Sequence, residues 1–148
     1  MELKDIVKNL ARTLDGLGIR YLITGGVAVT IWGVPRYTAD VDLVVEIEDK
    51  GKIEELSDAL KKSFPQSYVD INQAIDAFER KSEFNVIEPG LGVKIDFWIA
   101  KDEFDKARIK KAKSINIKGK MVKFISPEDL IISKLIWSKK SGRVVASD

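Results

Sequence analysis

The fold is decided by two short stretches, which read YLITGG at residues 21–26 and DVDLVV at residues 40–45. The first is an uncharged run that suits a strand buried on both faces, and its two glycines suit a tight turn. In the second, acidic and apolar residues alternate around Asp40 and Asp42. Side chains two apart on a strand point to the same face. We therefore expect a buried strand, a glycine turn, a short helix at 27–32 and an acidic strand at 40–47.

The surrounding residues alternate between helical and extended patterns. We expect helices at 2–15, 49–63, within 65–80 and from Pro127 to about Lys140, and a helical turn at 102–107. We expect two hairpins, formed by strands 84–87 and 93–99 and by strands 114–117 and 121–125. The pattern predicts an α/β (α+β) fold with a mixed β-sheet flanked by helices, in a single domain over residues 1–148.

A third carboxylate, Asp96, interrupts the otherwise apolar strand 93–99. If this strand lies beside the strand at 40–47, Asp40, Asp42 and Asp96 can converge on a metal pair. Mg²⁺ prefers hard oxygen ligands and takes one or two carboxylates together with phosphate oxygens. Two structural alternatives stay open, because the paired aspartates can be an exposed strand end and Asp96 can simply pair with Lys94.

Gly25 and Gly26 lie between the buried strand and the short helix. Glycines there allow the backbone to approach a ligand closely, and the N–H groups of the following helix favour a phosphate. An ordinary tight turn is the alternative. The stretch matches neither the P-loop pattern nor the dinucleotide-binding pattern.

Composition excludes several classes of chemistry. The chain has 148 residues, no cysteine and no histidine, so it has no disulfide, no thiolate metal site and no imidazole base. Catalysis would have to rely on carboxylates, lysine, arginine, hydroxyls, backbone amides or an oxygen-bound metal.

Positive charge gathers toward the C-terminus. Residues 101–148 carry 13 basic and 6 acidic side chains, although the whole chain has a formal net charge of +2. This favours a polyanionic partner such as a triphosphate or RNA, with a solvated lysine-rich surface as the alternative. The sequence shows no targeting segment and no membrane span, so we expect a cytoplasmic protein.

The order of these motifs resembles the DNA polymerase β-like nucleotidyltransferase superfamily, whose mark is a Gly-Gly or Gly-Ser turn, a D-x-D strand and a later lone aspartate. RYTADVDL at residues 36–43 and SPEDLIISKL at residues 126–135 are similar to the bacterial branch related to abortive-infection and toxin–antitoxin systems. The resemblance covers roughly residues 20–143.

The resemblance implies transfer of a nucleoside monophosphate from an NTP to an acceptor hydroxyl, with release of pyrophosphate. It implies that Asp40 and Asp42 ligate two Mg²⁺ ions, with Mn²⁺ as the alternative metal, and that Asp96 completes the catalytic site. It also implies that Gly25 and Gly26 hold the β- and γ-phosphates.

The last predicted helix, with Ser126 as N-cap, carries a further candidate residue. The resemblance implies that Lys134 contacts the triphosphate, whereas a lysine reaching out to water is the alternative. Arg36 and Thr38 are candidates for phosphate or acceptor contacts, or for structural roles in the loop. By helical spacing, we expect a core face made of Ile131, Ile132, Leu135 and Ile136.

Two other functions stay open beside the enzyme. The chain could be a non-catalytic nucleotide-binding or partner-binding module of a toxin–antitoxin-like pair, or an NTP sensor. The acceptor of an active enzyme could be tRNA or other RNA, a cognate antitoxin-like protein or a small molecule. The base of the NTP and the oligomeric state are not indicated by the sequence.

Overall fold

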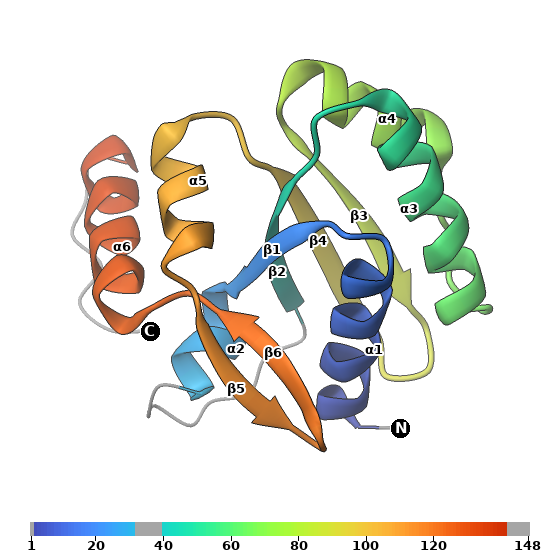
Figure 1. Ribbon diagram of the computed structural model, residues 1–148, viewed down its shortest axis with the longest axis horizontal. Coiled ribbons are helices and arrows are strands. Elements are labelled where there is room, and N and C mark those ends of the chain that lie inside the picture. Colours follow the sequence, from blue (N-terminus) through green and yellow to red (C-terminus); the bar gives the residue numbers. More distant parts are fainter. Residues whose placement is uncertain (1, 32–39, 142–148) are drawn as a thin grey trace.

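The computed structural model describes residues 2–31 and 40–141 (Figure 1). Arg36 and Thr38 lie outside the described residues. The elements follow one another as α1 (Leu3–Gly16), β1 (Arg20–Thr24), α2 (Gly25–Ile31), β2 (Asp40–Glu46), α3 (Lys50–Ser63), α4 (Ile71–Arg80), β3 (Glu83–Glu88), β4 (Val93–Ile99), α5 (Glu103–Lys110), β5 (Lys113–Ile117), β6 (Lys120–Phe124) and α6 (Pro127–Ser141).

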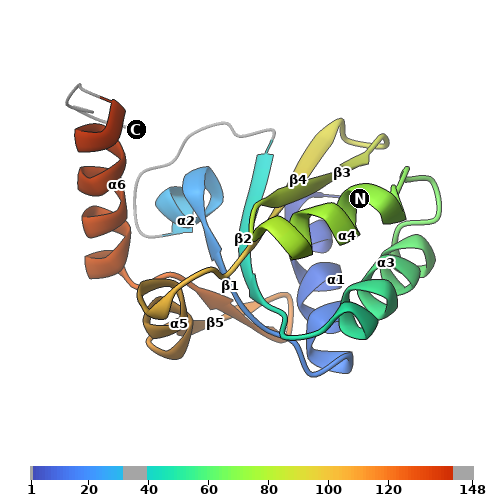
Figure 2. The ribbon, with the colours of Figure 1, turned by 90° about the horizontal axis from the view of Figure 1, so that it is seen from above.

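The strands form one mixed sheet of six, in the order β3-β4-β2-β1-β6-β5. β2 runs parallel to β4 and β1 runs parallel to β6, whereas the other neighbours are antiparallel. Figure 2 shows α1, α3 and α4 on one side of the sheet and α2, α5 and α6 on the other. The predicted fold class, a mixed sheet flanked by helices, is thereby confirmed.

The predicted alternation in the acidic strand is also confirmed. Val41, Leu43 and Val45 of β2 are fully buried in the core. Their side chains therefore lie on the face opposite to Asp40 and Asp42, because successive side chains of a strand alternate. The local pattern of apolar residues thus decides which side of the sheet receives the carboxylates.

Helix α6 begins as predicted but buries a different face. The backbone N–H of Asp129 donates to the Ser126 hydroxyl at 3.1 Å, which confirms the N-cap. The predicted core face is wrong: Ile131, Ile132, Leu135 and Ile136 are 61%, 44%, 63% and 40% exposed, whereas Leu130 is buried. In Figure 1, α6 lies at the edge of the molecule beside α5. Only the side of α6 that carries Leu130 meets the rest of the described fold, so apolar spacing alone misidentified the buried side.

The helices of the described residues are short. The longest, α6, has 15 residues. None of them combines the length and the hydropathy that crossing a bilayer requires.

Candidate active site

Two of the predicted carboxylates lie side by side on neighbouring strands. In the parallel pairing of β2 with β4, Asp42 is directly opposite Asp96, and Asp40 is opposite Lys94. Registered residues of adjacent strands project from the same side of a sheet, so Asp42 and Asp96 share one face. Asp96 is only 5% exposed, whereas Asp40, at the start of β2, is exposed. The adjacency of these strands brings together residues that are 54 positions apart in the sequence.

The proximity of these charges is unfavourable to the ionised form of Asp42. The pKa of Asp42 is raised to about 6, chiefly by burial and then by the negative charges of Asp96 and Asp40. A hydrogen bond with Asp96 also raises this pKa, whereas one with Trp98 lowers it. Lys94 offsets part of this negative charge, because its Nζ lies 3.5 Å from Asp96 Oδ2. Asp96 therefore pairs with Lys94 and also lies opposite Asp42.

Within the glycine turn, Gly25 lies against the acidic strand. Its φ is +71°, a conformation that favours glycine, and a Cβ at this position would collide with the carboxylate of Asp42, whose Cγ would be 3.1 Å away. The turn is therefore in direct contact with the D-x-D motif. The predicted order is slightly different here, because α2 begins at Gly25 instead of after Gly26.

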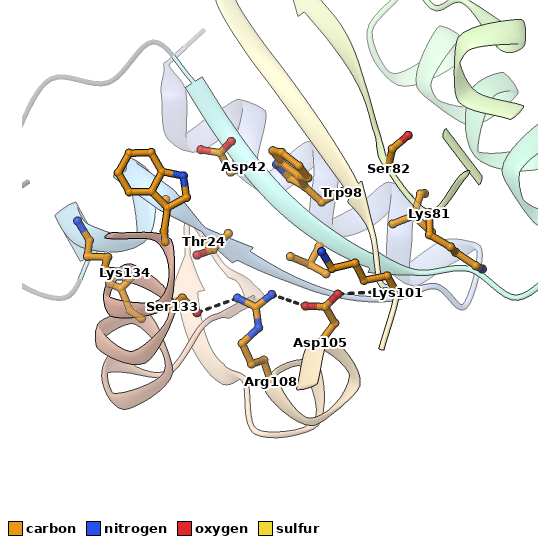
Figure 3. Close-up of a pocket in the computed structure, with 16 residues that line it drawn as sticks. Thr24, Asp42, Lys81, Ser82, Trp98, Lys101, Asp105, Arg108, Ser133 and Lys134 are labelled. Carbon is orange, nitrogen blue, oxygen red and sulfur yellow. Dashed lines mark hydrogen bonds and ion pairs between the residues drawn. The ribbon is translucent and has the colours of Figure 1, made fainter. Parts of the chain in front are cut away.

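A cavity of about 760 Å³ opens beside Asp42. Its walls come from the glycine turn with β2 and β4, from Lys81 and Ser82 after α4, from Lys101 after β4, and from the helices α5 and α6. Lys134 lines it together with both glycines of the turn, whereas Asp40 and Asp96 do not line it. Figure 3 shows Lys134 and Asp42 among the side chains around this cavity.

A buried ion pair within α5 is hydrogen-bonded to α6 at this cavity. The guanidinium of Arg108 donates to Asp105 Oδ1 at 2.7 Å and to the Ser133 hydroxyl at 3.0 Å, as Figure 3 shows. Asp105 also accepts from the backbone N–H of Lys101 at 3.0 Å. These contacts hold the residue before Lys134 against α5. Sequence reasoning missed this network, because in the sequence Arg108 is simply the first residue of a basic stretch that continues with lysines.

Sequence reasoning also missed two tryptophans of the cavity wall. Trp98 of β4 and Trp137 of α6 line the cavity, and they are 44% and 53% exposed. The alternation of β4 places Trp98 on the face of Asp96, which was a usable signal. Exposed indole rings at a cavity offer flat apolar surfaces to an aromatic ligand.

The carboxylates fit a hard divalent cation. Within residues 2–31 and 40–141, no three acidic side chains lie close enough together, as they are arranged, to hold a metal ion by themselves. Mg²⁺ needs only one or two carboxylates when substrate phosphates supply the remaining oxygens. Burial and the neighbouring charges of Asp96 and Asp40 raise the pKa of Asp42, and a bound cation would favour its ionised form.

Part of the predicted basic surface is neutralised within the fold. Lys118 forms ion pairs with Glu2 and Asp5, and Lys120 forms one with Asp15, all on or next to α1. These two lysines therefore have protein partners. The basic stretch available to a polyanion is smaller than the sequence suggested.

The comparisons with solved structures agree with the fold. A nucleotidyltransferase-like antigenic protein of Paracoccidioides brasiliensis is 31% identical, with 96% of this chain and 69% of that chain covered and a TM-score of 0.59. A candidate nucleotidyltransferase of Thermotoga maritima is 14% identical, with 96% and 90% covered and a TM-score of 0.56. ANT(2″)-Ia, solved with adenylyl-2″-tobramycin, is 21% identical, with 91% and 75% covered and a TM-score of 0.56. The last two show likeness of fold alone.

No functionally curated protein matches the chain. The family model described as "nucleotidyl transferase of unknown function (DUF2204)" matches residues 3–142, which is nearly the whole chain. Together with the fungal relative, this confirms the predicted resemblance to nucleotidyltransferases, whereas the toxin–antitoxin branch stays a prediction. Because this family model covers nearly the whole chain, including the glycine turn and the acidic strands, the chain belongs to the DUF2204 nucleotidyl transferase family.

Proposed function

We propose that the protein, as a single domain, is a magnesium-dependent enzyme that moves a nucleoside monophosphate from an NTP to an acceptor hydroxyl and releases pyrophosphate. The observation that carries this proposal is the contact between the two motifs: Gly25 has room for Asp42 only because it lacks a side chain, and Asp42 stands opposite Asp96. In this proposal the glycine turn, which suits phosphates, and the aspartate pair, which suits cations, are therefore parts of one site.

In this proposal Asp40, Asp42 and Asp96 are the metal ligands. When bound, magnesium would neutralise the charge of the triphosphate and favour ionisation of the acceptor hydroxyl. The protein's own contribution is positioning: β2 and β4 hold the carboxylates, and Lys94 forms an ion pair with Asp96.

The NTP occupies the cavity beside Asp42, whose volume is in the range of small-molecule sites. Gly25 and Gly26 approach the β- and γ-phosphates from one wall, and Lys134 approaches them from α6. Trp98 and Trp137 offer surfaces on which the base can stack. Arg36 and Thr38 are further candidates for phosphate or acceptor contacts.

The acceptor carries a hydroxyl group and is RNA, a protein partner or a small molecule. ANT(2″)-Ia holds an adenylylated small molecule, so a modified antibiotic is one form that the product could take. The exposed lysines at the end of α5 and the start of β5, Lys110 and Lys113, favour RNA as the first acceptor to test.

The proposal is tested by following the label of an α-labelled NTP. The protein is incubated with each of the four NTPs and MgCl₂, and with total RNA, cell lysate or tobramycin. Transfer of label to an acceptor, with pyrophosphate release, is the expected result. Asp42→Asn and Asp96→Asn should abolish both, and Asp58→Asn, an exposed aspartate of α3, should keep them.

A non-catalytic binding module of a toxin–antitoxin-like pair gives a different result. Such a protein would bind NTP or a partner, transfer no label, and keep partner capture after Asp42→Asn. Binding of NTPs that is indifferent to magnesium and to all three aspartates would contradict the proposed enzyme.

A further inference from the structure

Helix α6 presents an apolar stripe away from the rest of the described fold. The stripe consists of Ile131, Ile132, Leu135 and Ile136, which are the residues expected in the core and found exposed. Figures 1 and 2 show α6 at the margin of the molecule, with α5 on its inner side. Four large apolar side chains grouped on one helix face are more than scattered surface hydrophobics and indicate an interaction site.

The ends of this stripe carry opposite charges. Glu128 lies one turn before the stripe and Lys139 one turn after it, and both side chains are exposed. At 100° per residue, the two charges and the four apolar residues fall on one face of the helix. Glu128 and Lys139 are about 16 Å apart along the helix axis, since each residue adds about 1.5 Å.

The whole face is symmetric about the point midway between Ser133 and Lys134. Reversing the helix around this point exchanges Glu128 with Lys139, Ile131 with Ile136, and Ile132 with Leu135. An antiparallel copy of α6 would therefore meet each apolar residue with an apolar residue, and each charge with its opposite. A two-fold dimer needs such self-complementarity, because one patch contacts itself.

We propose that α6 pairs antiparallel with α6 of a second copy of this chain, around a two-fold axis that passes between Ser133 and Lys134. Ile131 and Ile132 pack against Ile136 and Leu135 of the other copy, and vice versa. Glu128 and Lys139 form an ion pair at each end of the interface. A second copy fits this face better than an unrelated partner because the charges at the two ends match only in this antiparallel register.

Pairing of this kind leaves the candidate active site accessible. Ser133 and Lys134 line the cavity with Leu130, on the side of α6 that meets the rest of the fold. In the dimer, the second copy packs against the outer face of α6 and thereby holds in place the helix that forms one wall of the cavity. One helix pair is a small interface, so we expect a dimer that dissociates on dilution.

Sedimentation equilibrium over protein concentrations from about 1 μM to about 1 mM tests the dimer, because weak interfaces of small area dissociate in this range. Lys139→Glu should weaken association about tenfold, since both end pairs become repulsive. Glu128→Lys should do the same, and the double variant Glu128→Lys/Lys139→Glu should restore association. Because Glu128 also borders a cavity with Lys110 and Lys111, the Lys139 variant is the cleaner single change.

Cysteine cross-linking tests the register, because the native chain has no cysteine. Mixed Ile132→Cys and Leu135→Cys chains should form a disulfide-linked heterodimer on oxidation. A mixture of Leu135→Cys with a chain carrying cysteine at exposed Lys61 of α3 is the control and should not. A monomer at every concentration, or a dimer that both single charge variants leave unchanged, would overturn the proposal and assign the stripe to another occupant.

Discussion

Replacing Asp42 with asparagine should stabilise the ligand-free protein while abolishing its proposed activity. The ionised Asp42 is partly buried and lies near Asp96 and Asp40, which is unfavourable without a cation. Asparagine has nearly the same shape and keeps an oxygen that can accept the hydrogen bond from Trp98. The substitution therefore removes a charge without opening a cavity.

The size and pH dependence of this effect follow from the pKa of Asp42. It is about 6 in the folded protein, against an ordinary value of 3.8. Because the folded-state pKa is raised, the neutral form stabilises the fold below about pH 4, and this contribution is lost as the pH rises through about 6. The full shift corresponds to about 3 kcal/mol at about 1.4 kcal/mol per pKa unit. Partial solvent exposure reduces this to about 1–2 kcal/mol.

The assay is urea unfolding of the ligand-free protein at pH 4 and pH 8, in the presence of a chelator. At pH 8, Asp42→Asn should increase the free energy of unfolding by about 1–2 kcal/mol and raise Tm by about 3–6 °C. At pH 4 the difference should nearly disappear. Asp58→Asn, a substitution on the exposed surface of α3, should change little at either pH.

Adding MgCl₂ with an NTP at pH 8 should stabilise the native protein and not Asp42→Asn, because a bound ligand stabilises only the state that binds it. If Asp42→Asn is no more stable than the native protein at pH 8, or gains as much at pH 4, the electrostatic account of this site is wrong.

Three further predictions concern the turn, the cavity and α6. Gly25→Ala should destabilise the fold by more than Gly18→Ala and remove activity: both residues have φ near +70°, which costs about 1–2 kcal/mol for alanine, but only a Cβ at position 25 meets Asp42. Equal unfolding free energies for the two variants would contradict this contact. Lys134→Ala should raise the Kd for NTP by about 10–100-fold, as loss of a charged hydrogen bond does, whereas Lys139→Ala should not, in calorimetric titrations. Leu130→Ala should cost about 2–4 kcal/mol of unfolding free energy in dilute solution, whereas the exposed Leu135→Ala should cost under about 0.5 kcal/mol. Similar costs for the two leucines would place the buried face of α6 elsewhere.

Local patterns were sufficient for much of the fold. The alternation in β2 placed Asp40 and Asp42 on the face opposite Val41 and Leu43, because the two-residue period of a strand needs no knowledge of its neighbours. The N-cap at Ser126 was equally readable, since a cap acts within one turn. Helix α2 begins two residues earlier than predicted, because Gly25 can begin a helix as readily as precede one.

The sequence alone determined that the chain has a buried strand ending in glycines, an acidic strand and a lone buried-strand aspartate, and these motifs were enough to indicate a nucleotidyltransferase. The tertiary structure alone decided that β4 lies beside β2 with Asp96 opposite Asp42, and that Arg108 connects α5 with Ser133 of α6. It also decided which side of α6 is buried. Strand order and helix packing depend on contacts between residues that are far apart in the chain. A local repeat of apolar residues does not indicate which neighbouring element will pack against them.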